Sequence, residues 1–335
     1  MMMGRILTSA LLAMSMVSCS PDVPKLKPRP EVRNDKVTAD TGTFVFTPEV
    51  DILFVVDSSG SMSTHQDNLA NNIDIFVRNF TNSIQIDYNV GVVTTDMSSS
   101  RYGGRLQGAF KFITPRTPNG LSEMAANLVV GTNGSWEEMS FDPAAAALSQ
   151  PLVDTWNLGF YRQSAHLAVI FITDAEDQSR MYDPQAFYNF LVNLKGFKEK
   201  VLGYGVIVPS SAGMSCERDE NVRPARIESF LGMTINAGKN VMSLCDPDFG
   251  TRLSDISKDI SKYVGGVIYL NRAPIIETIE VRYGTQIIPN GYGKGWVFDP
   301  RKNAIILGDE IEWLPQPLGT KIQVNFSAAQ FEEEK

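Results

Sequence analysis

Residues 51–63 read DILFVVDSSGSMS, an apolar run that ends at an acid and continues into serines and a glycine. A continuous apolar run of this length is typical of a strand that is buried on both faces of a parallel sheet. Ser63 and Gln66 then fit a capping box. Leu69 and Ile73 begin an apolar face at helical spacing. This stretch therefore predicts a buried strand, a polar loop and a helix.

Strand and helix signals alternate over residues 46–266. Further strands are predicted at 84–96, 166–174, 201–209 and 240–245, with an antiparallel edge strand within 103–114. Asp142-Pro143 and Asp183-Pro184 carry the residues expected where helices begin. Strands separated by helices predict an α/β fold: a doubly wound, mostly parallel sheet flanked by helices, Rossmann-like in layout.

The pattern changes after residue 266. Short apolar segments separated by Gly, Pro and Asn turns fill residues 267–331 and predict a small all-β sandwich domain. Residues 332–335 form an acidic tail.

The N-terminus is predicted to be a targeting segment rather than part of the fold. Arg5 precedes an apolar stretch that is too short to span a bilayer, which is typical of a secretory signal peptide. Its end resembles the signal of bacterial lipoproteins, which would be cleaved after residue 18 and lipidated on Cys19. That resemblance implies an outer-membrane lipoprotein facing the periplasm or the exterior. The Pro-rich residues 19–45 are predicted to be an extended tether.

Composition narrows the range of partners. The chain has 335 residues and a formal net charge of −8. This balance argues against nucleic acid and against an anionic membrane surface as the main partner. Cys216 and Cys245 remain after Cys19. In an oxidising compartment they are expected to form one disulfide, the alternative being two buried thiols.

Three acids, Asp57, Asp96 and Asp174, each end an apolar strand. If these strands run parallel, their carboxylates lie at one rim of the sheet, where doubly wound folds bind ligands. Ser59 and Ser61 follow Asp57 at intervals of two residues, so their side chains can point to one side. Carboxylates combined with hydroxyls suit a hard cation, Mg²⁺ first and Mn²⁺ or Ca²⁺ as alternatives. Such an ion would keep a coordination position open for an outside carboxylate.

The run from Asp57 to Ser61 matches DxSxS of the von Willebrand factor type A (VWA) domain, and FITD, ending at Asp174, resembles its later strand-end motif. The resemblance covers residues 46–266 and implies a metal-ion-dependent adhesion site (MIDAS). Ser59 and Ser61 would be direct ligands, and Asp57 and Asp174 would bind directly or through water.

The family's third ligand is a Thr in the loop between these motifs. GTNGS at 131–135 resembles the family pattern and would supply Thr132. Glu137, Glu138 and Ser140 lie closer to the next predicted helix and are alternatives. Asp96 is expected either to support the ligands from behind or simply to face water.

Other residues have competing interpretations. Trp136 is expected either to contact a ligand at the rim or to anchor its loop in the core. Asp246 and Asp248 are expected to cap a helix, with a Ca²⁺ site as the alternative. His65 and the serine-rich loop could indicate a Ser-His-Asp hydrolase, but the chain has no G-x-S-x-G motif. Asp57 could indicate a phosphoryl-transfer enzyme.

We therefore expect a lipid-anchored, divalent-metal-dependent, non-enzymatic module. It would bind a protein with an exposed acidic residue. The surface would be formed by residues 57–63, 96–104, 131–141 and 174–182, called the carboxyl rim below. The alternatives are a metal-independent scaffold in envelope assembly and, after it, a Mg²⁺-dependent hydrolase.

Overall fold

The computed structural model describes residues 41–81, 86–99, 101–210, 224–246, 249–317 and 319–329. The predicted signal peptide, Cys19, most of the tether, Cys216, Asp248 and the acidic tail lie outside the described residues, and what was expected of them stays a prediction. Within the described ranges, no helix combines the length and the apolar character that crossing a membrane requires.

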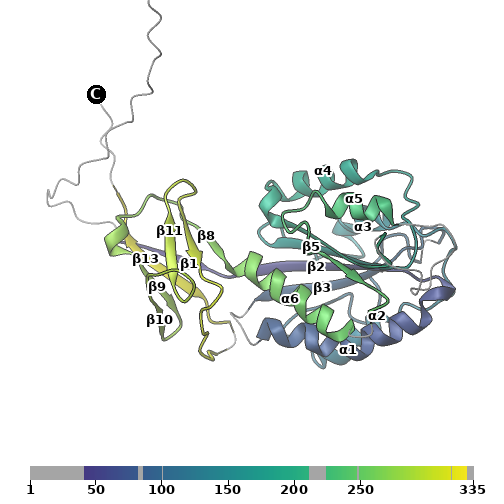
Figure 1. Cartoon of the computed structure of the whole chain (residues 1–335), viewed down its shortest axis with the longest axis horizontal. Helices are drawn as coiled ribbons and strands as arrows, with labels where there is room; N and C mark the ends of the chain where they lie inside the picture. The colour runs from purple at the N-terminus through teal and green to yellow at the C-terminus, as the bar shows by residue number, and fades with distance from the viewer. Residues whose placement is uncertain are drawn as a thin grey trace, which may run out of the picture. The chain divides into compact units, whose positions relative to one another are not determined.

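The central sheet contains six strands. They are β2 (Glu49–Val56), β3 (Asp87–Thr94), β4 (Phe112–Ile113), β5 (His166–Thr173), β6 (Val201–Ile207) and β7 (Val241–Ser243). Their order across the sheet is β4-β3-β2-β5-β6-β7, and all neighbours are parallel except β4, which runs antiparallel to β3. Figure 1 shows the central strands β3, β2 and β5 side by side. The strand order reverses between β2 and β5, which creates a switch point at their carboxyl ends. The doubly wound sheet is confirmed.

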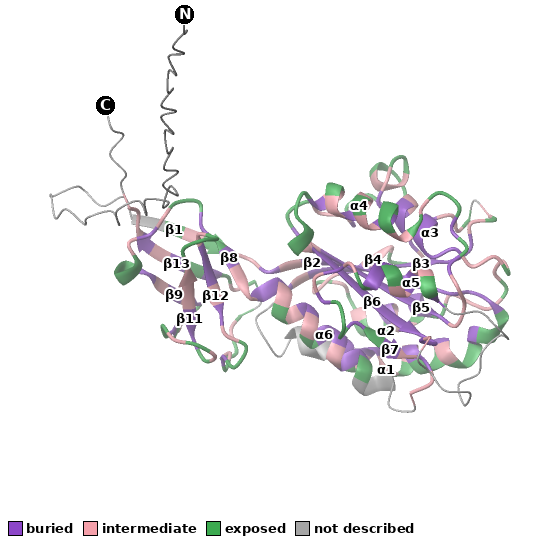
Figure 2. Cartoon of the chain, turned by 45° about the horizontal axis from the view of Figure 1, so that its top comes forward, coloured by how far each residue is buried: buried purple, intermediate pink, exposed green. Residues whose placement is uncertain are grey.

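Helices cover both faces of this sheet. They are α1 (Ser63–Thr81), α2 (Gly120–Leu128), α3 (Phe141–Ala147), α4 (Pro184–Lys195), α5 (Ala225–Leu231) and α6 (Phe249–Gly265). Alternate side chains of β2 point to opposite faces of the sheet. Phe54 joins Leu69 of α1 and Ile256 of α6 in one buried cluster, and Leu53 joins Phe141 of α3 in the other. Figure 2 shows the strands buried between these two helical layers.

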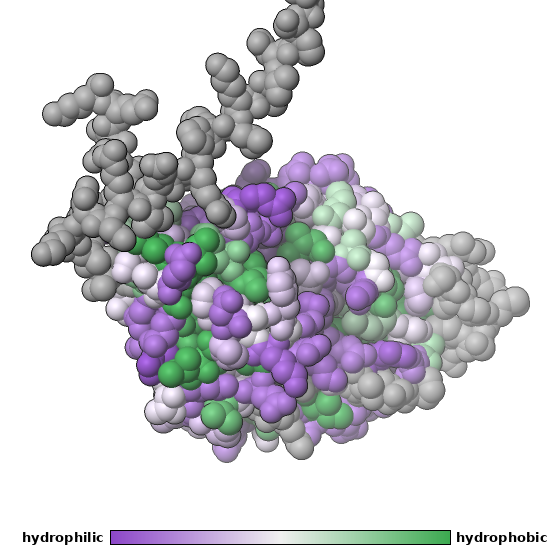
Figure 3. Space-filling model, turned by 60° about the vertical axis from the view of Figure 1, so that its left-hand side comes forward, coloured by the Kyte–Doolittle hydropathy of each residue, from purple (hydrophilic) through white to green (hydrophobic). Residues whose placement is uncertain are grey.

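The β domain consists of two antiparallel sheets. Their strands are β1 (Thr41–Phe46), β8 (Val267–Tyr269), β9 (Glu280–Tyr283), β10 (Gln286–Ile288), β11 (Trp296–Asp299), β12 (Ala304–Leu307) and β13 (Ile322–Ser327). The sheet orders are β1-β13-β9-β10 and β11-β12-β8, and side chains such as Val324 and Ile305 share one core. The predicted all-β domain is confirmed. On the face shown in Figure 3, hydrophilic and hydrophobic side chains are interspersed.

The first described strand belongs to the β domain and corrects the expected tether. β1 pairs with β13 in a continuous antiparallel ladder, from Thr41 opposite Ser327 to Phe46 opposite Ile322. Phe44 and Phe46 pack against the β core, so residues 41–45 are not part of an extended linker. The α/β domain is consequently inserted between β1 and β8, and two chain segments connect it to the β domain.

Two local predictions about helix starts have different outcomes. Asp183 caps α4 as expected, because its carboxylate accepts a hydrogen bond from the Ala186 N–H at 2.7 Å. Asp142 does not cap α3. The helix begins at Phe141, two residues before Pro143, where an Asp142 cap would place its start. The Asp142 carboxylate instead accepts hydrogen bonds from the Arg180 and Met181 N–H groups, in the loop that follows β5.

A buried ion pair closes the amino-end side of the sheet. Asp51 in β2 is fully buried, and its carboxylate accepts hydrogen bonds from the Arg162 N–H (2.7 Å) and the Arg162 Nε (2.8 Å). Burial raises the pKa of Asp51 to about 6, and the Arg162 charge opposes that rise. A buried carboxylate of this kind is tolerated because a cation is fixed beside it.

Replacing Arg162 with Met should therefore destabilise the fold by about 3–5 kcal/mol at neutral to alkaline pH. The pKa of Asp51 is higher in the folded state than in the unfolded state, so the ionised carboxylate costs stability above that pKa. Without the Arg162 charge the pKa of Asp51 should rise further, so the extra cost in the variant is largest at alkaline pH and falls as the carboxylate takes up a proton. The variant should therefore lose less stability at about pH 5 than at about pH 8 in urea unfolding. Arg301→Met, at a side chain that is 91% exposed, is the control. An equal loss at both pH values would contradict this account.

Candidate functional site

Two acids meet at the switch point of the sheet. Asp57 follows β2 and Asp174 follows β5, and these strands are joined beyond their ends because the Asp57 N–H donates to the Ile172 carbonyl oxygen at 2.9 Å. Asp57 is fully buried and Asp174 is half-buried. Burial raises the pKa of Asp57, and the negative charge of Asp174 adds to that rise. The site therefore brings together two acids whose negative charges interact, one of them fully buried.

Hydrogen bonds from neutral groups hold the Asp57 carboxylate in place. The Ser59 N–H donates to one carboxylate oxygen at 2.8 Å, and the Thr173 hydroxyl donates to the other at 2.7 Å. The Ser59 and Ser61 hydroxyl oxygens lie 3.0 Å apart, so the spacing of two residues does place both on one side of the loop. Met62 is fully buried and anchors the end of this loop in the core.

Gln66 bridges two loops of the carboxyl rim. Its side-chain amide donates to the Asp57 carbonyl oxygen at 2.7 Å and to the Gly131 carbonyl oxygen at 3.0 Å. Its side-chain oxygen accepts from the Gly131 N–H at 3.1 Å, and the residue is 1% exposed. The predicted capping box is therefore wrong, because Gln66 binds across to another loop. A sequence signal existed: Gln66 occupies a position on the apolar face of the helix, between Met62 and Leu69.

The loop that carries Thr132 has a second attachment to the Asp57 loop. The Gly134 N–H donates to the Ser58 carbonyl oxygen at 2.9 Å. The approach is so close that a Cβ at Gly134 would collide with the Ser58 hydroxyl oxygen, which explains the glycine. Thr132 lies between the Gly131 and Gly134 attachments, so both flanks of this residue are fixed against the DxSxS loop.

The alternative ligands are attached elsewhere. The Glu137 carboxylate pairs with Arg180, and the Glu138 carbonyl oxygen accepts from the Gln178 N–H at 2.8 Å. Ser140 is 2% exposed, and its N–H donates to the Asp177 carboxylate at 2.7 Å. These three residues hold the 131–141 loop to the loop that follows Asp174.

Asp96 holds loops together, and the expectation that it simply faces water is wrong. It is 4% exposed. One carboxylate oxygen accepts from the Ser98 N–H at 2.7 Å, and the other accepts from the Ser135 N–H at 3.2 Å. Asp96 therefore fixes the 131–141 loop from the β3 side.

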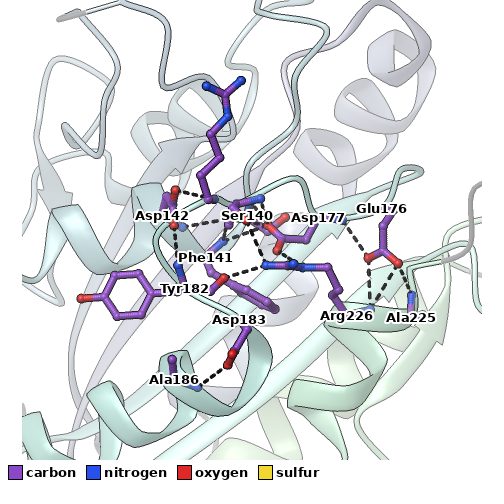
Figure 4. Close-up of polar contacts among 12 residues, drawn as sticks. Ser140, Phe141, Asp142, Glu176, Asp177, Tyr182, Asp183, Ala186, Ala225 and Arg226 are labelled. Carbon is purple, nitrogen blue, oxygen red and sulfur yellow. Dashed lines mark hydrogen bonds and ion pairs between the residues drawn. The ribbon is translucent and has the colours of Figure 1, made fainter.

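A polar network that the sequence did not reveal fixes the loop after Asp174 (Figure 4). The buried Asp177 carboxylate pairs with the Arg226 Nε at 2.9 Å, while Glu176 accepts from the Ala225 N–H at the start of α5 at 2.8 Å. The Asp142 carboxylate points to the backbone of the same loop and accepts from the Arg180 N–H at 2.9 Å. Only the fold brings these groups together, since α3, this loop and α5 are far apart in the sequence.

Two large apolar side chains project from the carboxyl rim. Trp136 is 78% exposed and Met181 is 77% exposed. The expectation that Trp136 anchors its loop in the core is therefore wrong. The ion pair between Glu137 and Arg180 connects the residues next to them, so the two apolar side chains are carried by loops that contact each other.

The remaining candidates do not add to the site. His166, the second histidine of the chain besides His65, starts β5 at the opposite end of the strand from Asp174, and burial lowers its pKa to about 4. Asp246 pairs with Arg252. Cys245 takes part in a disulfide, and because Cys216 lies outside the described residues its pairing with Cys216 stays a prediction.

The residues present fit a hard divalent cation. Within the described ranges, neither Asp57 nor Asp174 forms a salt bridge, so two neighbouring carboxylates lack a positive charge. The same ranges hold no group of three or more His, Cys, Asp or Glu side chains that could bind a metal, which leaves two carboxylates and hydroxyls as the donor set. Such an all-oxygen set suits Mg²⁺, Mn²⁺ or Ca²⁺ better than the nitrogen- and sulfur-rich sites that Zn²⁺ prefers.

Comparison with known proteins gives structural matches only. No family model and no curated protein matches the sequence. The pilus adhesin SpaC from Lactobacillus rhamnosus GG, in its open conformation, is 11% identical with a TM-score of 0.41, and the match covers 84% of this chain and 38% of that chain. A von Willebrand factor type A protein from Catenulispora acidiphila is 12% identical with a TM-score of 0.36, covering 88% and 62%.

Proximal thread matrix protein 1 from the mussel byssus, with a zinc-occupied MIDAS motif, is 15% identical with a TM-score of 0.36, covering 66% of this chain and 47% of that chain. This chain thus spans less than two thirds of the length of each of these proteins. At these identities and TM-scores the similarities carry no argument about function, and the α/β architecture is established by the sheet order.

Replacing Gln66 with Leu tests the bridge between the loops. We expect a loss of about 1–3 kcal/mol in the free energy of unfolding, because the Asp57 carbonyl and the Gly131 N–H would be buried without partners. The Gly131 and Gly134 amides should exchange with solvent faster, while amides in the middle of β2 and β5 should keep their protection. Gln163→Leu, at an exposed position, is the control. Unchanged exchange at Gly131 would show that the bridge does not hold the loop.

Proposed function

We propose that this chain is a divalent-metal-dependent protein-binding module of the adhesion type, in which the metal coordinates an acidic group of the partner. The observation that carries the proposal is the pair formed by the fully buried Asp57 and the half-buried Asp174 at the switch point. Among the described residues, no cationic side chain is paired with either acid. A bound divalent ion would remove the repulsion between the two acids and offset the cost of burying Asp57.

The proposed ligands are Ser59 and Ser61, with Asp57 and Asp174 binding directly or through water. Two carboxylates would only neutralise a divalent ion, and hydroxyls add no charge. An ion held in this way attracts a further anionic ligand, and a carboxylate from outside is the natural one. The hydrogen bonds from Ser59 and Thr173 keep the Asp57 carboxylate oriented before any ion arrives.

We propose Thr132 as the third protein ligand. It lies between two attachments to the DxSxS loop, through Gln66 and through Ser58. Glu138 belongs to the part of the loop that is attached to the loop after Asp174. A neutral Thr in this position would leave the metal more attractive to an acidic partner than a carboxylate would.

The partner is proposed to contact Trp136 and Met181 around the metal. Exposed tryptophan and methionine are enriched in protein interfaces. Both lie on loops whose backbones are held by hydrogen bonds to the buried carboxylates of Asp177 and Asp142. The partner would then present an acidic residue with apolar side chains near it. Lipid anchoring on Cys19 in the bacterial outer membrane and a non-enzymatic role complete the proposal.

The ligand assignment is tested by Thr132→Ala with Glu138→Gln as its matched counterpart. Thr132→Ala should weaken Mg²⁺ binding about tenfold, or about 1.4 kcal/mol, because one ligand oxygen is lost. Glu138→Gln should leave the affinity within about twofold, which isothermal titration calorimetry resolves. If Glu138→Gln weakens Mg²⁺ binding and Thr132→Ala does not, the third ligand is Glu138 and not Thr132.

Asp57→Asn tests the metal site itself. The variant should lose Mg²⁺ binding. In EDTA its free energy of unfolding should be about 1–2 kcal/mol larger than that of the wild type, because a buried charge beside Asp174 is removed. Mg²⁺ should raise the melting temperature of the wild type and of Asp67→Asn, an exposed control in α1, but not that of Asp57→Asn. A Mg²⁺-dependent rise in the melting temperature of Asp57→Asn would contradict a metal site at Asp57.

Partner binding is tested by a pull-down in which envelope proteins are passed over the immobilised chain. Proteins retained with Mg²⁺ should be released by EDTA, should be absent with Asp57→Asn, and should be reduced with Trp136→Ala at unchanged Mg²⁺ affinity. Retention of the same proteins in excess EDTA would favour the metal-independent scaffold.

A further inference from the structure

The segment between β3 and α2 is strongly cationic in an acidic chain. Residues 97–119 contain four basic side chains, Arg101, Arg105, Lys111 and Arg116, and no acid, although the chain has a net charge of −8. None of the four forms an ion pair with another described residue. The other arginines that flank the sheet, Arg162 and Arg226, are paired with buried acids.

Two of these cations converge on one indole ring. The Lys111 Nζ lies 3.8 Å and the Arg105 guanidinium carbon 4.8 Å from the centroid of Trp156. The Lys111 Nζ also donates to the Gly108 carbonyl oxygen at 3.4 Å. Loss of solvent, and then the Arg105 charge, lowers the pKa of Lys111. Two like charges held together in this way are an arrangement that an anion would stabilise.

The ring is partly open to solvent, and exposed apolar residues lie close to Lys111 and Trp156 in the sequence. Trp156 is 41% exposed, Phe110 beside Lys111 is 41% exposed, and Leu158 is 68% exposed. We call the set Arg105, Phe110, Lys111, Trp156 and Leu158 the Trp156 patch. It combines two positive charges with apolar surface, so a ligand that matches it carries both negative charge and an apolar side chain.

The backbone under the Trp156 patch is fixed. The Trp156 Nε1 donates to the Leu106 carbonyl oxygen at 3.0 Å, and the Leu106 N–H donates to the Asn157 side-chain oxygen at 3.0 Å. Asn157 is 1% exposed, and its amide group donates to the Gly104 carbonyl oxygen at 2.9 Å. A ligand would therefore meet a preformed surface, and binding would require little ordering of the loop.

From this geometry we infer that the Trp156 patch is a second, metal-independent docking site, and that its partner is a short acidic protein segment with an aromatic or aliphatic residue next to the acids. Two cations at one ring match a short segment with a few acids better than an extended polyanion. At physiological ionic strength, salt screens charges over about 8 Å, so only the few carboxylates closest to Arg105 and Lys111 would be attracted by them. A nucleic acid or an anionic membrane extends beyond the patch and would be repelled by the net negative charge of the chain.

The Trp156 patch shares no residue with the proposed metal ligands. Two positions for acidic side chains on one chain would allow a partner with two acidic segments to bind at both, and the linked contacts would raise its overall affinity.

The experiment uses the full chain in EDTA and a blocked Phe-Glu-Glu-Glu peptide as the probe. Calorimetry should detect binding to the wild type, no binding of the matched Phe-Gln-Gln-Gln peptide, and an affinity for the acidic peptide that falls as salt is raised from about 0.05 M to about 0.5 M. The double variant Arg105→Gln/Lys111→Gln should bind at least about tenfold more weakly. The control Arg301→Gln/Lys302→Gln removes the same charge at exposed positions and should leave the affinity unchanged.

Three outcomes would overturn the inference: equal affinity in the two double variants, equal binding of the Gln peptide, or binding of wild-type protein to anionic phospholipid vesicles with none to the acidic peptide. If the double variant melts early, Lys111→Gln alone and Trp156→Phe give the same test with smaller perturbation. Asp57→Asn should keep the peptide affinity in EDTA, so loss of the metal site and loss of the Trp156 patch are measured separately.

Discussion

The rest of the carboxyl rim depends on one buried charge. Asp57 ends a central strand with no exposed surface, receives hydrogen bonds only from neutral groups, and lies near the negative charge of Asp174. A carboxylate in this position costs free energy unless a positive charge accompanies it. At the amino-end side of the same strand, Asp51 is equally buried and has Arg162 beside it. The contrast between these two ends of β2 is the physical reason for placing a cation at Asp57 and not at Asp51.

The loops around Asp57 are held before any ligand binds. Gln66 and Gly134 attach the 131–135 segment to the DxSxS loop, Asp96 attaches it to the end of β3, and Asp177 attaches its far end to the loop after Asp174. Sites that bind by positioning several weak ligands gain affinity when the ligands are ordered in advance. The same hydrogen bonds leave Trp136 and Met181 to solvent, so the scaffold that orders the acids also presents apolar surface around them.

Much of the fold could be predicted because its signals are local. Continuous apolar runs identified β2, β5 and β6, and the Asp183 cap of α4 is an interaction over three residues. Two of the errors arose where a polar side chain had two possible partners. Gln66 and Asp142 were assigned to their own helices, but both bind loops that arrive from elsewhere in the chain. Hydrophobic periodicity cannot distinguish these cases, since it records burial and not the identity of the neighbour.

The amino-acid pattern alone predicted a buried strand ending at Asp57, two serines able to place their side chains on one side of a loop, and a second acid at the end of another strand. Which loops meet there depends on tertiary contacts. Gln66 reaches Gly131 over 65 residues of sequence, and β1 pairs with β13 from opposite ends of the described chain. Such contacts are set by the strand order and by how the loops cross the sheet edge, neither of which has a local signature. For that reason the position of Thr132, the exposure of Trp136 and the two cations on Trp156 became visible only in the folded chain.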